Sequence, residues 1–137
     1  MKIIPIYIEA GVSGFESPAA EYKELGLSLD ELLIENPTAT FIGLASGESM
    51  QGIGIFDGDL LIVDRSKQVK NNAVIVANYN GCFVCKTLNK THAQLISASQ
   101  IHPPITITTS DDFQIEGVVT RVIRILEPIR ELNQCML

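Results

Sequence analysis

The dipeptide Asn80-Gly81 is the feature that most narrows the folds open to this chain. It lies between two apolar segments, residues 73–79 and residues 82–88, that contain several β-branched and aromatic side chains. Asn-Gly favours the left-handed backbone conformations of a two-residue type I′ turn, whose twist matches that of paired strands. The sequence therefore predicts a β-hairpin here and an antiparallel sheet around it.

The chain from Thr38 onward continues the same pattern on both sides of this hairpin. Short segments of apolar and β-branched residues are separated by turn residues, mainly Gly, Asp, Asn and Pro. Gly117 interrupts the last segment and marks a bulge or a sharp bend. Many short strands with such turns predict a mainly β fold, a rolled sheet or partly open barrel. The further predicted strands are residues 40–45, 59–63, 94–97, 105–109 and 113–125.

Residues 1–37 differ from the rest and are predicted to form a flexible N-terminal arm, ahead of a β-rich domain at residues 38–137. The arm lacks β-alternation, and its glycines and prolines favour turns. One short helix is expected at residues 28–35. Ser28 is its candidate N-cap, and Glu31 completes a capping box three residues later.

Composition limits the classes of function. The chain has 137 residues, 46% of them hydrophobic, which suffices for one compact domain with its own core. Acidic residues outnumber basic ones by 16 to 10, a poor match for DNA phosphates, so a peptide or protein partner is favoured over direct nucleic-acid binding. No run approaches the ~20 apolar residues that span a bilayer. Together with an odd number of cysteines, this predicts a cytoplasmic protein.

The histidines and cysteines form no complete site in the sequence. His92 lies in a polar turn and His102 precedes two prolines, so both are interpreted as surface loop residues. Cys82 and Cys85 form a C-x-x-C pair, but a zinc site usually needs a second pair of ligands. Residues three apart on a strand also point to opposite faces, so the two thiols are predicted to be small, buried side chains. We expect no metal and no cofactor.

A second candidate site lies just after the first predicted strand, in residues 45–50. This glycine-containing turn can hold the Ser49 hydroxyl clear of the sheet, within reach of a substrate carbonyl. Backbone N–H groups at Ser49 and Met50 are free of sheet pairing there and are candidates for an oxyanion hole. Taken alone, the hexapeptide also fits an ordinary polar loop.

Lys86 is the single lysine inside an apolar predicted strand. A lysine on a buried face is costly unless it loses its proton or finds a partner. Acting as a base near pH 7 requires its pKa to fall by ~3 units from ~10.4. A neutral amine can then take the proton from a serine. The alternative is an edge-strand lysine whose amine reaches water.

Three segments together resemble the LexA/UmuD family of SOS-response autopeptidases. Residues 46–50 (SGESM) are similar to its nucleophile motif, residues 58–64 (GDLLIVD) to the segment that follows it, and residues 83–88 (FVCKTL) to the segment that carries its lysine. Their order and spacing also fit. The resemblance implies a serine–lysine dyad, with Ser49 as nucleophile and Lys86 as general base, on a fold like those of LexA and signal peptidases.

The N-terminal region is similar to UmuD rather than LexA. Residues 14–22 (GFESPAAEY) resemble the signature just past the UmuD cleavage point, which places the cut at Ser13-Gly14. Ala10-Gly11 is a dipeptide typical of the family, but it lies three residues too far upstream of this signature, so it is the second choice. With 13 residues upstream of the signature, no helix-turn-helix is expected, and the repressor function of LexA is not implied.

The resemblance also implies partners. Such proteins form homodimers, and the apolar strand surface at residues 118–125 is a candidate interface. A RecA filament on single-stranded DNA stimulates cleavage. The trimmed form is an accessory subunit of an error-prone Y-family translesion polymerase, the UmuC-like subunit. Two alternatives stay open: a signal-peptidase-like enzyme that acts on other chains, and a catalytically silent, dimeric interaction module of the same fold.

Overall fold

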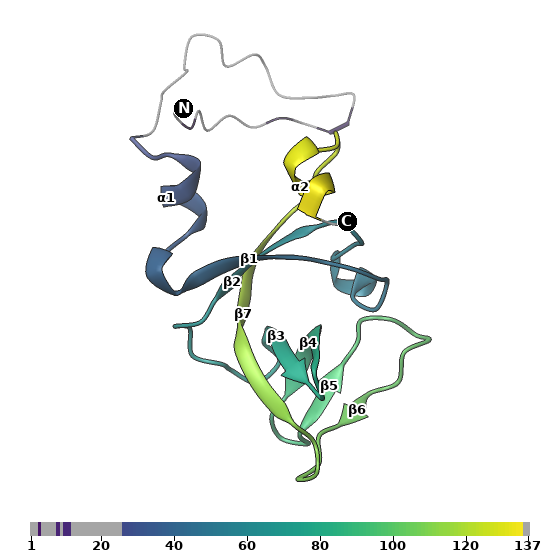
Figure 1. Ribbon diagram of the computed structural model, residues 1–137. Helices are drawn as coiled ribbons and strands as arrows, with labels where there is room; N and C mark the ends of the chain where they lie inside the picture. Colours follow the sequence, from purple (N-terminus) through teal and green to yellow (C-terminus); the bar gives the residue numbers. More distant parts are fainter. Residues whose placement is uncertain (1–2, 4–7, 9, 12–25, 136–137) are drawn as a thin grey trace. The chain divides into compact units, whose positions relative to one another are not determined.

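The computed structural model describes residues 3, 8, 10–11 and 26–135, and it divides the chain into two compact units, Met1–Glu35 and Asn36–Leu137. The helix α1 (Leu29–Leu33) belongs to the first unit, and the strands all belong to the second (Figure 1).

The start of α1 is formed as the sequence predicts. The Glu31 backbone N–H donates to Ser28 Oγ over 3.3 Å, and the Ser28 N–H donates to the Glu31 carboxylate over 3.4 Å, so the capping box is confirmed. The predicted end at residue 35 is wrong, because the backbone is already extended at Ile34. Two leucines of α1 stay largely exposed among the described residues, Leu29 at 46% and Leu32 at 42%.

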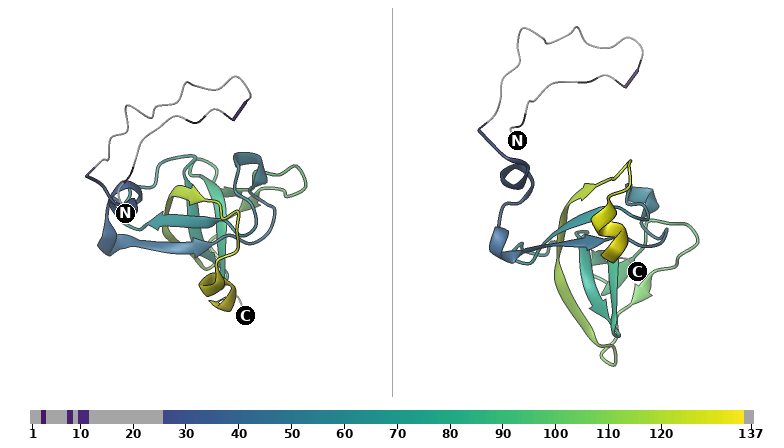
Figure 2. Two further views of the ribbon diagram at one scale, coloured as in Figure 1. Left: turned by 90° about the horizontal axis from the view of Figure 1, so that it is seen from above. Right: turned by 45° about the horizontal axis from the view of Figure 1, so that its top comes forward.

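The second unit is built on one antiparallel sheet of seven strands, in the order β1-β2-β7-β3-β4-β5-β6. The order leaves β1 and β6 at opposite edges, so the sheet is curled but not closed, and the predicted mainly β, partly open fold is confirmed (Figure 2). Two 3₁₀ turns, η1 (Pro37–Ala39) and η2 (Gln51–Ile53), and the helix α2 (Arg130–Cys135) complete it. The strands are β1 (Thr40–Leu44), β2 (Leu60–Asp64), β3 (Val74–Tyr79), β4 (Cys82–Asn89), β5 (Gln94–Ile96), β6 (Ile105–Thr106) and β7 (Phe113–Ile123).

The β3–β4 hairpin has the predicted turn. Asn80 and Gly81 have φ values of 51° and 86°, the positive values that a type I′ turn requires at both central positions. Tyr79 pairs with Cys82 across the turn, and the register continues to Val74 opposite Thr87. The hairpin prediction is therefore confirmed, including its register.

The long strand β7 joins the two halves of the sheet. Its first part pairs with β3 and its second part with β2, with an irregularity in each pairing. Val76 lies opposite Gly117 but Ala77 lies opposite Ile115, so a bulge occurs at the residue beside the predicted glycine. A Cβ at Gly117 would lie 2.7 Å from Val63 Cγ1, so only glycine permits this close approach of strands.

The core lies on both faces of the central strand β3. Val76 belongs to a cluster with residues of β2 and the loop before it, whereas Ile75 and Ala77 belong to a second cluster with residues of β4 and β5. A strand buried on both faces reads as a continuous apolar run, as residues 74–77 do. The first cluster is Met50, Ile55, Leu61, Val63 and Val76, and the second is Ile75, Ala77, Leu88 and Leu95.

Candidate functional site

Ser49 lies in a turn at residues 45–50, here called the serine turn, which follows β1 directly. The loop that contains it is closed at its base by two hydrogen bonds, from Ala45 N–H to Asp59 O and from Gly58 N–H to Ala45 O, both 2.8 Å. Gly47 has a φ of 92°, a conformation that favours glycine, and its N–H donates to the Asp57 carboxylate over 2.8 Å. The backbone of the turn is thus held from several sides.

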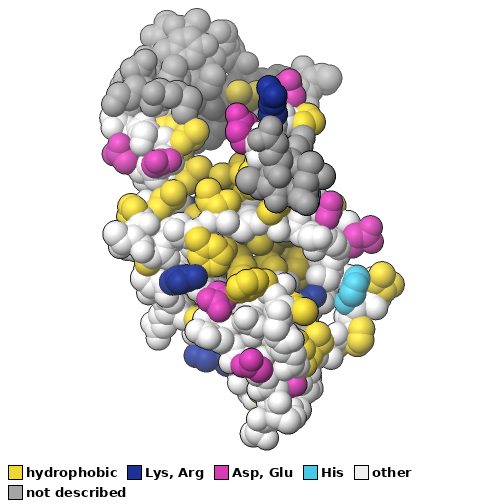
Figure 3. Space-filling model, in the orientation of Figure 1, with side chains coloured by type: hydrophobic (Ala, Val, Ile, Leu, Met, Phe, Trp, Pro, Cys, Tyr) yellow, Lys and Arg dark blue, Asp and Glu magenta, His cyan; other side chains and the backbone are white. Residues whose placement is uncertain are grey.

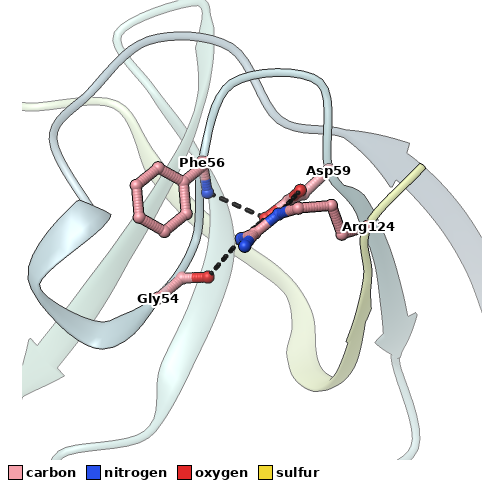
Figure 4. A network of polar contacts seen from close by, with 4 residues as sticks. All are labelled: Gly54, Phe56, Asp59 and Arg124. Atoms are coloured by element: carbon pink, nitrogen blue, oxygen red, sulfur yellow. Dashed lines mark hydrogen bonds and ion pairs between the residues drawn. The ribbon is translucent and has the colours of Figure 1, made fainter. Parts of the chain in front are cut away.

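An ion pair fixes the far side of the same loop (Figure 4). The Arg124 guanidinium donates to both oxygens of the buried Asp59 carboxylate, over 2.9 and 2.8 Å, and also to Gly54 O over 2.9 Å. The same guanidinium lies 4.4 Å from the centre of the Phe56 ring. The hydrogen bonds from Arg124 hold the pKa of Asp59 below its usual value, although burial acts in the opposite direction. The loop is thereby tied to the chain beyond β7.

Lys86 extends from the middle of β4 towards this turn. Its Nζ donates to Ser49 Oγ over 2.8 Å, and the residue is only 9% exposed. Within the part of the chain that the structure describes, Lys86 forms no ion pair with a carboxylate. Burial lowers the pKa of Lys86 below its usual 10.5, while Cys85 acts in the opposite direction. The alternative of a lysine that reaches water from an edge strand is wrong, because β4 lies between β3 and β5 in the sheet and Lys86 is almost fully buried.

Ser97 is a second partner of the same amine, and the sequence did not point to it. Lys86 Nζ donates to Ser97 Oγ over 2.8 Å. Thr87 pairs with Ile96 in the β4–β5 ladder, so continuing that register by one residue places Ser97 opposite Lys86. A correct register for these two short strands would have identified Ser97 from the sequence.

A cleft of about 460 Å³ opens beside Ser49 and Lys86. Most of its wall is apolar and comes from β1, the serine turn and the β3–β4 hairpin, where Figure 3 shows hydrophobic side chains gathered. Phe83 at the rim is 71% exposed. The cleft suits an extended peptide with small or apolar side chains. Its other lining residues include Phe41, Leu44, Met50, Ile55, Leu61, Val76, Val84 and Cys85.

The backbone N–H groups of Ser49 and Met50 have no hydrogen-bond partner among the described residues. They follow a strand and precede η2, so neither the sheet ladder nor a helix uses them. The Met50 side chain is 4% exposed and packs in the first core cluster, which anchors the turn from below. An oxyanion hole at these two groups remains a prediction.

The two C-x-x-C thiols have different environments. Cys85 packs against the first core cluster, and burial raises the pKa of its thiol to about 11. Cys82 is exposed at the end of the hairpin, so the prediction that both side chains are buried is wrong for Cys82. In the described ranges no group of three or more His, Cys, Asp or Glu residues could hold a metal ion.

The histidines lie in loops, as predicted. His92 is exposed in the turn after β4, and His102 Nδ1 lies 2.9 Å from Ser99 Oγ in the loop after β5. Neither loop position is hydrogen-bonded to Ser49 within the described part of the chain.

The predicted cleavage site Ser13-Gly14 lies outside the described residues. Ala10 and Gly11, the second choice, are described and exposed, in a bend of the first unit. A search of the described helices for one long and apolar enough to cross a membrane finds none.

Comparisons with known proteins match residues 3–120 to the family described as Peptidase S24-like. Protein ImpA of Escherichia coli is 34% identical over 126 residues, which covers 92% of this chain and 87% of ImpA. Protein SamA of Salmonella typhimurium is 35% identical over 120 residues, 87% of this chain and 84% of SamA. The LexA repressor of Azoarcus sp. is 34% identical over 109 residues, 77% of this chain and 54% of the repressor.

Proposed function

This chain belongs to the peptidase S24-like family of serine peptidases, as a UmuD-like member of its LexA/UmuD group, and we propose that it cleaves its own N-terminal arm with a Ser49–Lys86 dyad. One observation carries the proposal: the 2.8 Å contact between Ser49 Oγ and a buried Lys86 amine at the edge of an apolar cleft. A nucleophile within hydrogen-bond reach of its base is the arrangement that covalent catalysis requires.

The base is Lys86 in its neutral form. Its enclosure disfavours the ammonium, so a larger fraction of the amine is neutral at a given pH than for a lysine in water. As Ser49 Oγ bonds to the scissile carbonyl carbon, its proton passes to Lys86 Nζ. The carbonyl oxygen becomes an oxyanion, which accepts hydrogen bonds from the Ser49 and Met50 N–H groups.

The remaining steps return the enzyme to its starting state. The Lys86 ammonium gives its proton to the leaving amine as the carbon–nitrogen bond breaks, which leaves the upstream fragment esterified to Ser49. A water molecule then loses a proton to Lys86 and attacks the ester, which releases the fragment and restores the serine hydroxyl.

The substrate is the chain's own arm, residues 1–37. The bond that we propose is cut is Ser13-Gly14, and Ala10-Gly11 is the alternative. β1 is an edge strand whose residues 43–44 line the cleft, so an extended segment can pair with its free side and pass Ser49. Glycine after the bond lets the backbone approach the nucleophile without a Cβ.

The biological role proposed here is the one that the resemblance to the LexA/UmuD family implies. After trimming, the processed chain forms a homodimer through its β-rich domain at residues 38–137 and serves in the cytoplasm as accessory subunit of a UmuC-like, Y-family translesion polymerase. A RecA filament on single-stranded DNA stimulates the cut. The formal charge of −6 supports protein partners rather than direct contact with DNA. This chain is similar to ImpA and SamA over more than four-fifths of its length, which supports this role more than that of a repressor.

The test is alkaline incubation of the purified chain, followed by intact mass and N-terminal sequencing of the larger fragment. High pH deprotonates Lys86, so we expect self-cleavage without a partner and a new N-terminus at Gly14. Ser49→Ala should abolish it, because the attacking oxygen is gone, whereas Ser110→Ala, an exposed serine outside the cleft, should cut like the parent. A start at Gly11 would move the cut upstream. Undiminished cleavage in Ser49→Ala would refute the dyad, and no cleavage at any pH would favour the silent interaction module.

A further inference from the structure

Two adjacent residues after β5, Ser97 and Ala98, contact both halves of the candidate dyad and are here called the strap. Ser97 Oγ accepts a hydrogen bond of 2.8 Å from Lys86 Nζ. The next residue contacts the segment that carries the nucleophile: Ala98 O accepts a hydrogen bond of 2.7 Å from Gly52 N–H. Gly52 lies in η2, three positions after Ser49. The strap therefore bridges the base and the segment that carries the nucleophile.

The contact between the strap and η2 is unusually close. A Cβ added at Gly52 would lie 2.6 Å from Ala98 O and 3.2 Å from Ala98 Cβ, so any side chain there must push the two segments apart. Gly52 has an ordinary backbone conformation, so space rather than conformational freedom requires glycine at this position. Gly54, two residues on, is the reverse case, with a φ of 89° and nothing within 4 Å.

The strap is also anchored on both sides. On its N-terminal side, Leu95 is fully buried and Ile96 pairs with Thr87 of β4. On its C-terminal side, Ser99 Oγ accepts a hydrogen bond of 3.3 Å from Ile101 N–H and lies 2.9 Å from His102 Nδ1. A segment held in this way can transmit a fixed distance between the groups that it touches.

We propose that the strap is a positioning element of the peptidase site: Ser97 orients the Lys86 amine, and Gly52 lets the serine turn dock on Ala98 at the correct distance from that amine. This inference rests on the proposed self-cleavage and adds residues to it. A lysine side chain has four rotatable bonds and no carboxylate partner among the described residues, so one hydrogen bond to Ser49 alone would leave the amine poorly fixed once Ser49 has reacted. Ser97 keeps the amine in place throughout the cycle.

Ser97→Ala separates a positioning role from simple loss of structure. Without the hydroxyl, the amine is less well oriented, so the plateau rate of self-cleavage at alkaline pH should fall by about 10- to 100-fold. The hydroxyl also accepts a bond from the charged form, so its loss should lower the Lys86 pKa and move the midpoint of the pH–rate profile to lower pH. Ser97→Thr keeps the hydroxyl and should restore both. Ser110→Ala, an exposed serine outside the cleft and the strap, should match the parent.

Gly52→Ala tests the other contact of the strap. The added methyl group must displace Ala98, so the plateau rate should again fall by about tenfold or more. Because Ser97 and Gly52 act through one segment, the double variant should lose less than the product of the two single losses. Ser110→Ala, the exposed serine outside the cleft, is the control here as well. Fully additive losses would contradict a shared strap.

A measurement without cleavage keeps this inference separate from the proposed function. In a Ser49→Ala background the chain stays intact, and the Lys86 amine can be titrated by NMR through its side-chain carbon and nitrogen shifts. Ser97→Ala should lower the titration midpoint of Lys86 in that background, and Ser110→Ala should not. An unchanged midpoint contradicts the positioning role of the strap even if the parent cleaves. A parent that never cleaves contradicts the proposed function, and the titration then tests the positioning role by itself. An unchanged plateau rate in a cleaving Ser97→Ala variant also overturns it.

Discussion

The serine turn and the strap each place a serine hydroxyl 2.8 Å from the same amine, yet they are held in different ways. Ser49 lies in a loop that is closed at its base by backbone hydrogen bonds and tied to β7 by the Asp59–Arg124 ion pair. Ser97 needs only the register of two short strands, because it directly follows a paired and buried segment. A group presented by a loop requires many anchors, whereas a group at a strand end takes its position from the sheet.

The amine shared by both serines gives the largest expected effect. Lys86→Ala should reduce self-cleavage at alkaline pH by about a thousandfold or more, because the general base is lost. Lys86→Arg should fail equally, since a guanidinium stays protonated at any working pH. Intact-mass time courses measure both.

Lys90→Ala, an exposed lysine just past the end of β4, is the control and should cut at the parent rate. If Lys86→Arg cleaved as fast as the parent, a neutral amine at this position would not be the base. That result would remove the common partner on which the comparison depends.

The anchors of the serine turn can be broken without touching the dyad. Arg124→Met removes the bidentate pair to Asp59 and the hydrogen bond to Gly54 O. The serine turn should then be less well fixed, and the plateau rate of self-cleavage should fall by about tenfold. Arg65→Met is the control, because Arg65 also stacks on an aromatic ring but has a carboxylate at 3.8 Å and is largely exposed. Equal losses in the two variants would show that the anchor of the turn is not specific.

The same variant has a pH signature. The Asp59 pKa is lowered in the folded chain, mainly by its hydrogen bonds from Arg124, so the pair contributes stability above the unfolded value of 3.8. That contribution is lost as the pH falls through the folded pKa, where the carboxylate gains its proton. Urea unfolding should therefore separate parent from Arg124→Met most widely near neutral pH, and the gap should narrow below pH 3.8. A gap that widened in acid would contradict this.

The smallest expected effects are changes in unfolding free energy at two glycines, Gly47 in the serine turn and Gly52 against the strap. Gly47 needs its positive φ of 92° but has open space around it, so Gly47→Ala should cost about 1 kcal/mol of unfolding free energy from backbone strain alone. Gly47→Asn should cost less, since asparagine tolerates this conformation. Gly52→Ala meets Ala98 instead and should cost more than Gly47→Ala. Urea unfolding of the three variants measures the order, and the reverse order would contradict the assignment of one glycine to conformation and the other to space.

What the sequence predicts well is local. Asn80-Gly81 specifies a turn by its own backbone preferences, and Ser28 with Glu31 forms a cap within one helical turn. The pairing of Ser49 with Lys86 is not local, and the sequence predicted it through the family resemblance of the two segments, since each residue alone also fitted an ordinary structural role. Gly117 was predicted as a bulge or bend, but its close approach to Val63 could only be seen once the strands were paired.

What the sequence does not reveal depends on partners far along the chain. Arg124 pairs with Asp59, which lies 65 positions earlier, and the residues around each of them do not predict this pairing. Ser97 follows a strand of three residues, too short for its register to be read from alternation. The end of α1 was misplaced because Ile34 leaves the helix before Pro37 compels it to, and Cys82 was misjudged because the hairpin end projects beyond the core.

The position of β7 has a consequence for when a newly made chain can cut itself. In the sheet, β2, which follows the nucleophile loop, and β3, whose hairpin partner carries the base, are hydrogen-bonded to β7 rather than to each other, and β7 is the last of the seven strands in chain order. A growing polypeptide on the ribosome therefore holds both reactive groups long before it holds the strand that brings them together, and such non-local pairing forms slowly. If the chain cleaves itself as proposed, we expect this cleavage to wait for the completed sheet, so that the arm survives synthesis.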